Sequence, residues 1–172
     1  MAVYALGEVA PVIDPSAFVH PDATVIGDVT IGAESSIWPG AVLRGDHGSV
    51  SVGSRTSVQD GSVIHAGPGF PTVIGDGCVI GHIVHLEGCM LEDDCLIGSG
   101  AVVLHHVVVG RGALVAAGAV VPNGVHVPAG ALAVGVPATV KPDGSHPELI
   151  RVSAEEYVKN ARRYRAELRR VD

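Results

Sequence analysis

The sequence predicts one all-β domain, a parallel β-helix of six-residue repeats followed by a C-terminal α-helix. An aliphatic residue recurs at every sixth position through most of the chain, and a small residue stands four places after most of these positions. An α-helix would need apolar spacing near 3.6 residues, and an open sheet would need strands separated by clusters of turn residues. Six residues instead make one short strand and a corner, and three such sides, about eighteen residues, close one triangular coil.

Two columns of side chains are expected to point into the stacked coils. The aliphatic column consists of Ile13, Val19, Val25, Ile31, Ile37, Leu43, Val52, Val58, Ile64, Ile74, Ile80, Leu86, Leu91, Ile97, Val103, Val109, Val115, Val121, Val127 and Ala133. The column of small residues consists of Ala17, Ala23, Ser35, Ala41, Thr56, Ser62, Cys78, Cys95, Ala101, Ala113, Ala119 and Ala131. A chain with 47% hydrophobic but only 3% aromatic residues suits a core of such small and branched side chains.

The repeat stops after Pro137. We therefore expect residues 1–140 to form the β-helix, and residues 141–172 to form a linker and a helix that packs back on it as part of one domain. Ser153 has the character of an N-cap, and Glu156 three places later would complete a capping box. The apolar stripe of this expected helix consists of Tyr157, Ala161, Tyr164 and Leu168.

Charge and hydropathy exclude several classes of function. The formal net charge is −7, and the basic residues gather near the C-terminus, where we expect a solvated helix face and no nucleic-acid site. No window of eighteen apolar residues occurs, and the N-terminal MAVYALGEVAP lacks the basic segment of a signal peptide. We expect a cytoplasmic protein with no membrane partner. Its cysteines, Cys78, Cys89 and Cys95, are expected to be reduced packing residues.

The period of six fails at three places that should line up in space. Three extra residues follow the repeat of Leu43, four follow that of Ile64, and one residue is missing after Leu86. All three breaks fall on the same side of the triangle, on successive coils. Because side chains alternate along a strand, the next residues should point outward, and these are Arg44, His65 and Glu87. An exposed column of this kind beside aligned irregularities indicates a functional site.

A second polar column is expected at the preceding corner, where Asp60 and His82 should stack. His82 and Glu87 are five residues apart, which is about 15 Å along an extended chain, and ligands of one zinc ion lie within about 4 Å of one another. A symmetric oligomer would instead place this corner against the outward column of a neighbouring subunit. One docking would then bring His82 to His65 and Asp60 to Arg44.

The repeat resembles that of the hexapeptide-repeat family, whose members form a left-handed parallel β-helix, over roughly residues 13–138. At the breaks the resemblance becomes more specific, to the γ-class carbonic anhydrases. It rests on WPGAVLRGD (38–46), VQDG (58–61), IHAGPGFPT (64–72), IGHIVHLEGC (80–89) and the terminal AEEYVKNARRY. In that family three histidines hold zinc between the subunits of a homotrimer, and two of them correspond to His65 and His82.

The third ligand departs from the family pattern, since Glu87 stands where a histidine is expected. The resemblance implies a ligand set of His65, His82 and Glu87, with His85 as a rival for the third place. Zinc is the expected metal, and iron or cobalt would also suit histidine and carboxylate ligands. A carboxylate in place of an imidazole lowers the charge of the site, which should raise the pKa of metal-bound water.

The resemblance implies further roles around the metal. Gln59 would orient the bound hydroxide or CO2, and Tyr157 would supply an aromatic hydroxyl from the terminal helix. Arg44, Asp46 and Asp60 would form ion pairs at the subunit interface and border the site. Two other features are expected to lie outside the chemistry: Trp38 should pack at the interface, and an exposed turn should hold His105 and His106.

The function implied is reversible hydration of CO2 to bicarbonate by a metal-bound hydroxide at a trimer interface, weak or absent if Glu87 impairs the site. One alternative is a CoA-dependent acyltransferase of the hexapeptide-repeat class, which would use a histidine as general base. Another is a non-catalytic trimer that acts as a scaffold or binding protein. Metal content would separate these hypotheses.

Overall fold

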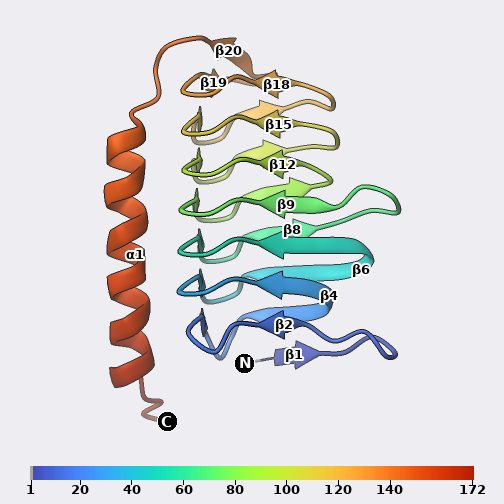
Figure 1. The fold of residues 1–172 in the computed structure, drawn as a ribbon, viewed down its shortest axis with the longest axis vertical. Helices are drawn as coiled ribbons and strands as arrows, with labels where there is room; N and C mark the ends of the chain where they lie inside the picture. Colours follow the sequence, from blue (N-terminus) through green and yellow to red (C-terminus); the bar gives the residue numbers. More distant parts are fainter. Residues whose placement is uncertain (1) are drawn as a thin grey trace.

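The computed structural model describes residues 2–172, which form a left-handed parallel β-helix with one α-helix along its side (Figure 1). The strands are β1 (Ala2–Tyr4), β2 (Val12–Ile13), β3 (Phe18–Val19), β4 (Thr24–Ile31), β5 (Ser36–Ile37), β6 (Val42–Val52), β7 (Ser57–Val58), β8 (Val63–His65), β9 (Thr72–Ile74), β10 (Val79–Ile80), β11 (His85–Glu87), β12 (Met90–Leu91), β13 (Leu96–Ile97), β14 (Val102–Val103), β15 (Val108–Val109), β16 (Leu114–Val115), β17 (Val120–Val121), β18 (His126–Val127), β19 (Leu132–Val134) and β20 (Thr139–Lys141). The helix is α1 (Pro147–Glu167).

Strand pairing confirms the predicted coil. β13 pairs in parallel with β16, and Leu96 stands opposite Leu114, eighteen residues further along the chain. The three breaks lengthen or shorten single coils without disturbing the stack: Leu43 stands opposite Ile64, and Ile64 opposite Leu86. The extra residues after Leu43 form no loop, because β6 continues around the corner as far as Val52.

Both inward columns are confirmed by burial. The aliphatic column is buried from Val19 to Ala133, whereas Ile13 is only half-buried because its coil, the first, is covered on one side alone. In the second column, hydroxyl groups satisfy backbone carbonyls between coils, as where Ser62 Oγ donates to Gly81 O at 2.7 Å and Thr56 Oγ1 to Gly75 O at 2.8 Å. The core is therefore continuous through the stack. All three cysteines are free and buried.

The predicted start of the helix was wrong. α1 begins at Pro147, with His146 as its N-cap and no side-chain capping bond, so Ser153 lies inside the helix and forms no capping box. Proline is favoured at the first helical position because its missing N–H would have no partner there. The face buried on the β-helix consists of Ile150, Ala154, Val158 and Ala161. Leu168 follows the helix and is 46% exposed, so it does not extend the stripe.

Trp38 was expected to pack at the subunit interface, but it is 6% exposed and lies beneath α1 of its own chain. Its ring contacts Tyr164 and Tyr157, with centroids 5.0 Å and 5.8 Å away, and Phe18 at 5.5 Å. Its Nε1–H is 3.0 Å from the hydroxyl oxygen of Ser36 and 3.0 Å from that of Ser57. Trp38 therefore fixes the helix on the β-helix.

Ion pairs add to this docking at the first coils. Glu34 pairs with Arg55 and with Arg162 of α1, and Arg55 also pairs with Glu155. At least one basic residue of α1, Arg162, thus pairs with a carboxylate of the coils, and others are exposed to solvent. Across residues 2–172, the structure contains no helix with both the length and the apolar character needed to cross a membrane.

Candidate metal centre

The predicted outward column is present on one side of the β-helix. β6, β8 and β11 are neighbours, and their register sets Arg44 opposite His65 and His65 opposite Glu87. Each side chain is partly buried, with 15% exposure for His65 and 25% for Glu87. The parallel ladder therefore delivers three polar side chains to one face in vertical order, which the aligned breaks had predicted.

His65 lies between two carboxylates. Its Nδ1 is 2.9 Å from Oε1 of Glu87, and its Nε2 is 2.9 Å from Oδ1 of Asp46. Asp46 also forms an ion pair with Arg44 two residues earlier. Burial would raise the pKa of Asp46, but hydrogen bonds with His65 and Arg44 outweigh it and lower that pKa to about 2. Asp46 is therefore a fixed anion that holds the ring of His65.

Three imidazoles surround Glu87. Besides His65, Nε2 of His85 lies 3.2 Å from Oε2, and Nε2 of His105 lies 3.6 Å from Oε1. Burial opposes ionisation of Glu87, yet hydrogen bonds with His65 and His85 outweigh it and lower the pKa of this carboxyl. His85 thus faces Glu87 on the same side, as predicted.

His105 was missed, because residues 105 and 106 were interpreted as an exposed turn with no break beside them. That interpretation holds for His106 but is wrong for His105, which is half-buried. The signal lay in the residue missing after Leu86. It shortens the coil so that Leu86 stands opposite Val103, and two residues further on His105 comes to lie over Gly88 and beside Glu87.

The predicted corner pair is also present. Nδ1 of His82 lies 3.0 Å from Oδ2 of Asp60, and both side chains are about half exposed. Tyr157 of α1 is near enough for the negative charge of Asp60, together with burial as the larger cause, to raise the pKa of its hydroxyl. Gln59 is 4% exposed. Gln59 and Tyr157 therefore border the His82 corner.

The side chains of both columns are of the types that bind metals, but they form two separate half-sites within one chain. A histidine that binds a metal commonly donates its other ring N–H to a carboxylate, and Asp46 and Asp60 are placed to accept from His65 and His82. Nδ1 of His65 and Oε1 of Glu87 are 2.9 Å apart, close to the roughly 3.3 Å between neighbouring ligands of tetrahedral zinc. Yet no group of three His, Cys, Asp or Glu side chains among the described residues could hold a metal within one chain.

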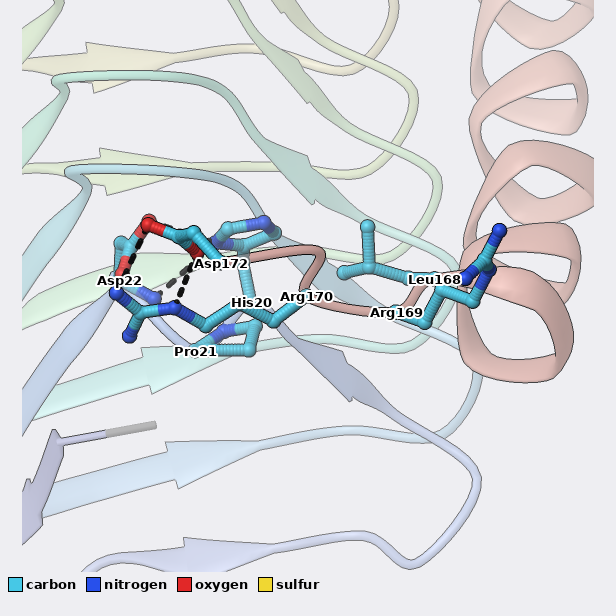
Figure 2. Close-up of a pocket in the computed structure, with 7 residues that line it drawn as sticks. All are labelled: His20, Pro21, Asp22, Leu168, Arg169, Arg170 and Asp172. Atoms are coloured by element: carbon cyan, nitrogen blue, oxygen red, sulfur yellow. Dashed lines mark hydrogen bonds and ion pairs between the residues drawn. The ribbon is translucent and has the colours of Figure 1, made fainter.

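A separate pocket at the amino-terminal end of the stack takes in none of these residues. Figure 2 shows it between the corner of His20, Pro21 and Asp22 and the C-terminal tail. Arg170 in the tail pairs with Asp172 at 2.7 Å. The pocket shares no residue with the two half-sites.

The fold defines a class, the hexapeptide-repeat β-helix proteins. The chain belongs to the bacterial transferase hexapeptide family, whose model of six repeats matches residues 10–45, 71–103 and 88–123, more than half of the chain, and within it to the γ-carbonic anhydrase-like proteins.

Its relatives carry different names. Gamma carbonic anhydrase 1, mitochondrial, of Arabidopsis thaliana is 47% identical over 106 residues, 58% of this chain, so the match spans only 38% of that relative's length. Carnitine operon protein CaiE of Citrobacter koseri is 38% identical over 170 residues, 98% of this chain and 86% of the relative. A hexapeptide transferase family protein from Anaplasma phagocytophilum is 36% identical, with a TM-score of 0.91 over 95% of this chain and 98% of that one.

Proposed function

We propose that this protein is a metal-dependent hydratase of the γ-carbonic anhydrase kind, which interconverts CO2 and bicarbonate at sites shared between the subunits of a homotrimer. The observation that carries the proposal is the pairing of each candidate ligand histidine with its own carboxylate. His65 has Asp46, and His82 has Asp60. Such pairs fix the tautomer and the direction of a ligand imidazole, and surface histidines have no need of them.

The two halves of the site would come from different subunits. His65 and Glu87 of one subunit would meet His82 of its neighbour, with His85 as the rival to Glu87 for the third place. Bound there, zinc would supply a Lewis acid that lowers the pKa of water toward neutrality, and iron or cobalt would suit the same ligands. Two histidines and one carboxylate leave a position open for substrate.

The chain's own residues would prepare the site around that position. Asp46, held by Arg44, keeps the ring of His65 in one orientation. The side-chain amide of Gln59 offers both donors and an acceptor, so it can orient a small polar substrate. Tyr157 keeps its proton at neutral pH, because its pKa is raised, and can donate a hydrogen bond beside the His82 corner. Arg44 and Asp60 would form the ion pair that aligns the subunits.

Metal content and CO2 hydration measured together test the proposal. The wild-type protein, His65→Ala and His82→Ala should be compared, with His126→Ala as a matched control on an exposed strand remote from both columns. We expect about one zinc, iron or cobalt ion per subunit in the wild type and the control, and strong loss in both ligand variants. CO2 hydration should be measurable only in the variants that retain the metal.

The same preparations separate the alternatives. A wild-type protein that binds no metal but transfers acetyl groups from acetyl-CoA would be an acyltransferase. A stable trimer with neither property would be a scaffold or binding protein. Metal retained at full stoichiometry by a monomer would contradict the shared site.

A further inference from the structure

A stacked pair of rings, Phe70 and His105, lies beside Glu87. The loop between β8 and β9 carries Phe70, whose ring stacks on the imidazole of His105 with centroids 5.6 Å apart and planes 29° apart. His105 in turn places Nε2 3.6 Å from Oε1 of Glu87. His106 also meets the ring of Phe70 edge-on, with centroids 4.6 Å apart. The extra residues after Ile64 thus bring Phe70 against His105, which lies beside the candidate ligand.

The approach of these rings depends on Gly88. This residue has a φ of +62°, and a Cβ built there would lie 2.7 Å from Cδ2 of His105 and 3.0 Å from Cβ of Phe70. The first distance is shorter than side-chain carbons tolerate and the second is tight, so a larger residue would have to displace the ring of His105. Glycine is therefore required at this position both for the backbone conformation and for the space.

The base of the same loop is tied to both strands that carry candidate ligands. Thr72, which is fully buried, donates its hydroxyl to the carbonyl of His65 and accepts the N–H of Gly88 at 2.8 Å. The loop is also closed on itself, because Gly67 and Phe70 exchange backbone hydrogen bonds of 3.2 Å and 3.0 Å. Phe70 consequently has a fixed place relative to β8 and β11.

We propose that His105, clamped by Phe70 over Gly88, is a positioning residue that keeps the carboxylate of Glu87 turned toward His65. A glutamate has more rotatable bonds than the histidine it replaces, so a carboxylate ligand loses more freedom when it is fixed. A ring packed on rigid coils removes that freedom before a metal binds, which raises affinity without a new metal contact. The inference rests on the proposed function, since it concerns the same Glu87.

The first test needs no metal. Crystal structures of metal-free wild type and His105→Ala should be compared, together with His106→Asn, which removes the edge contact with Phe70 but leaves His105 in place. We expect one Glu87 conformer facing His65 in the wild type and in His106→Asn, and a displaced or multiple conformer in His105→Ala. Phe70→Ala should produce the same displacement through loss of the stacked ring. An unmoved Glu87 in both His105→Ala and Phe70→Ala would overturn the proposal.

The second test uses zinc and cobalt. We expect the dissociation constant for zinc, measured by competition with a chelator, to rise roughly tenfold in His105→Ala, with altered visible bands of the cobalt-substituted protein. His106→Asn should match the wild type. Unchanged affinity and spectrum in His105→Ala, with metal lost in Glu87→Ala, would sink the positioning role and leave the hydratase proposal standing. A wild type that binds no metal would sink the hydratase proposal, while the crystal structures would still decide the role of His105.

Discussion

Glu87 and His65 stand at matched positions on neighbouring coils, and Oε1 of Glu87 lies 2.9 Å from Nδ1 of His65. The same carboxylate meets His85 through its other oxygen, at 3.2 Å. Glu87 is thus the residue on which the two versions of the candidate ligand set depend.

If Glu87 is the third ligand, Glu87→Ala should weaken zinc binding by tenfold or more, while His85→Ala should have a small effect. Glu87→His should increase CO2 hydration at neutral pH, because a neutral ligand leaves more positive charge on the metal and lowers the pKa of water there. If His85 is the ligand, the order of the two alanine variants reverses. Metal content and hydration rate of the three variants decide between them. Full metal retention in both alanine variants would exclude both ligand sets.

Arg44→Ala should weaken assembly. The change removes the partner of Asp46 within the chain and the expected partner of Asp60 across the interface. An anion left without its partner in a partly buried place is destabilising, so the concentration at which the proposed trimer dissociates should rise about tenfold.

Sedimentation over a dilution series would measure this. Arg111→Ala is a suitable control, because Arg111 pairs with Asp93 on an exposed corner and such pairs contribute little. Equal dissociation of Arg44→Ala and Arg111→Ala would argue against a role for Arg44 between subunits.

Trp38→Ala should lower the free energy of unfolding by about 3–5 kcal/mol, because it removes a buried ring that packs on two tyrosines of α1. Trp38→Phe keeps most of the packing but loses the hydrogen bonds to Ser36 and Ser57, so its cost should be smaller. Urea unfolding of the three proteins measures the difference. A loss of trimer with no change in the stability of the subunit would mean that Trp38 acts between subunits after all.

The ion pairs of Glu34 should make the stability of helix docking depend on pH. The pKa of Glu34 is lowered from 4.5, chiefly by its hydrogen bond with Arg162. A carboxyl with a lowered pKa in the folded state stabilises the fold fully above its unfolded pKa, and this contribution disappears as the pH falls through the folded pKa. Melting temperatures of wild type and Glu34→Gln should therefore differ at pH 7 and converge below pH 4.5. A difference that persists undiminished in acid would contradict this origin.

Most of the fold could be predicted from the sequence, because a repeat of six residues determines which side chains point into the coil. Each column residue from Val19 onward stands where the count placed it, and even the coils with breaks kept their register. The column of Arg44, His65 and Glu87 followed from the same count. Local periodicity is enough when each coil touches only its neighbours.

The predictions that were wrong all involve contacts that the six-residue repeat does not determine. Trp38 was assigned to an interface, because nothing in the repeat says which side α1 covers. The helix start was misplaced, because Ser153 and Glu156 satisfy a capping pattern that Pro147 pre-empts six residues earlier. His105 was overlooked, because its approach to Glu87 depends on a shortened coil and on the space above Gly88.

The return of α1 to the first coils has a consequence for synthesis. Phe18 and Trp38 are synthesised more than 100 residues before Tyr164, which packs against both. Likewise, Arg162, the partner of Glu34, is synthesised 128 residues later. The coils can stack as they emerge, since each needs only the one before it. Until α1 has been synthesised, Phe18 and Trp38 therefore stay uncovered on the nascent chain. A ribosome that stalls before codon 147 would release stacked coils with exposed aromatic side chains, which chaperones could bind.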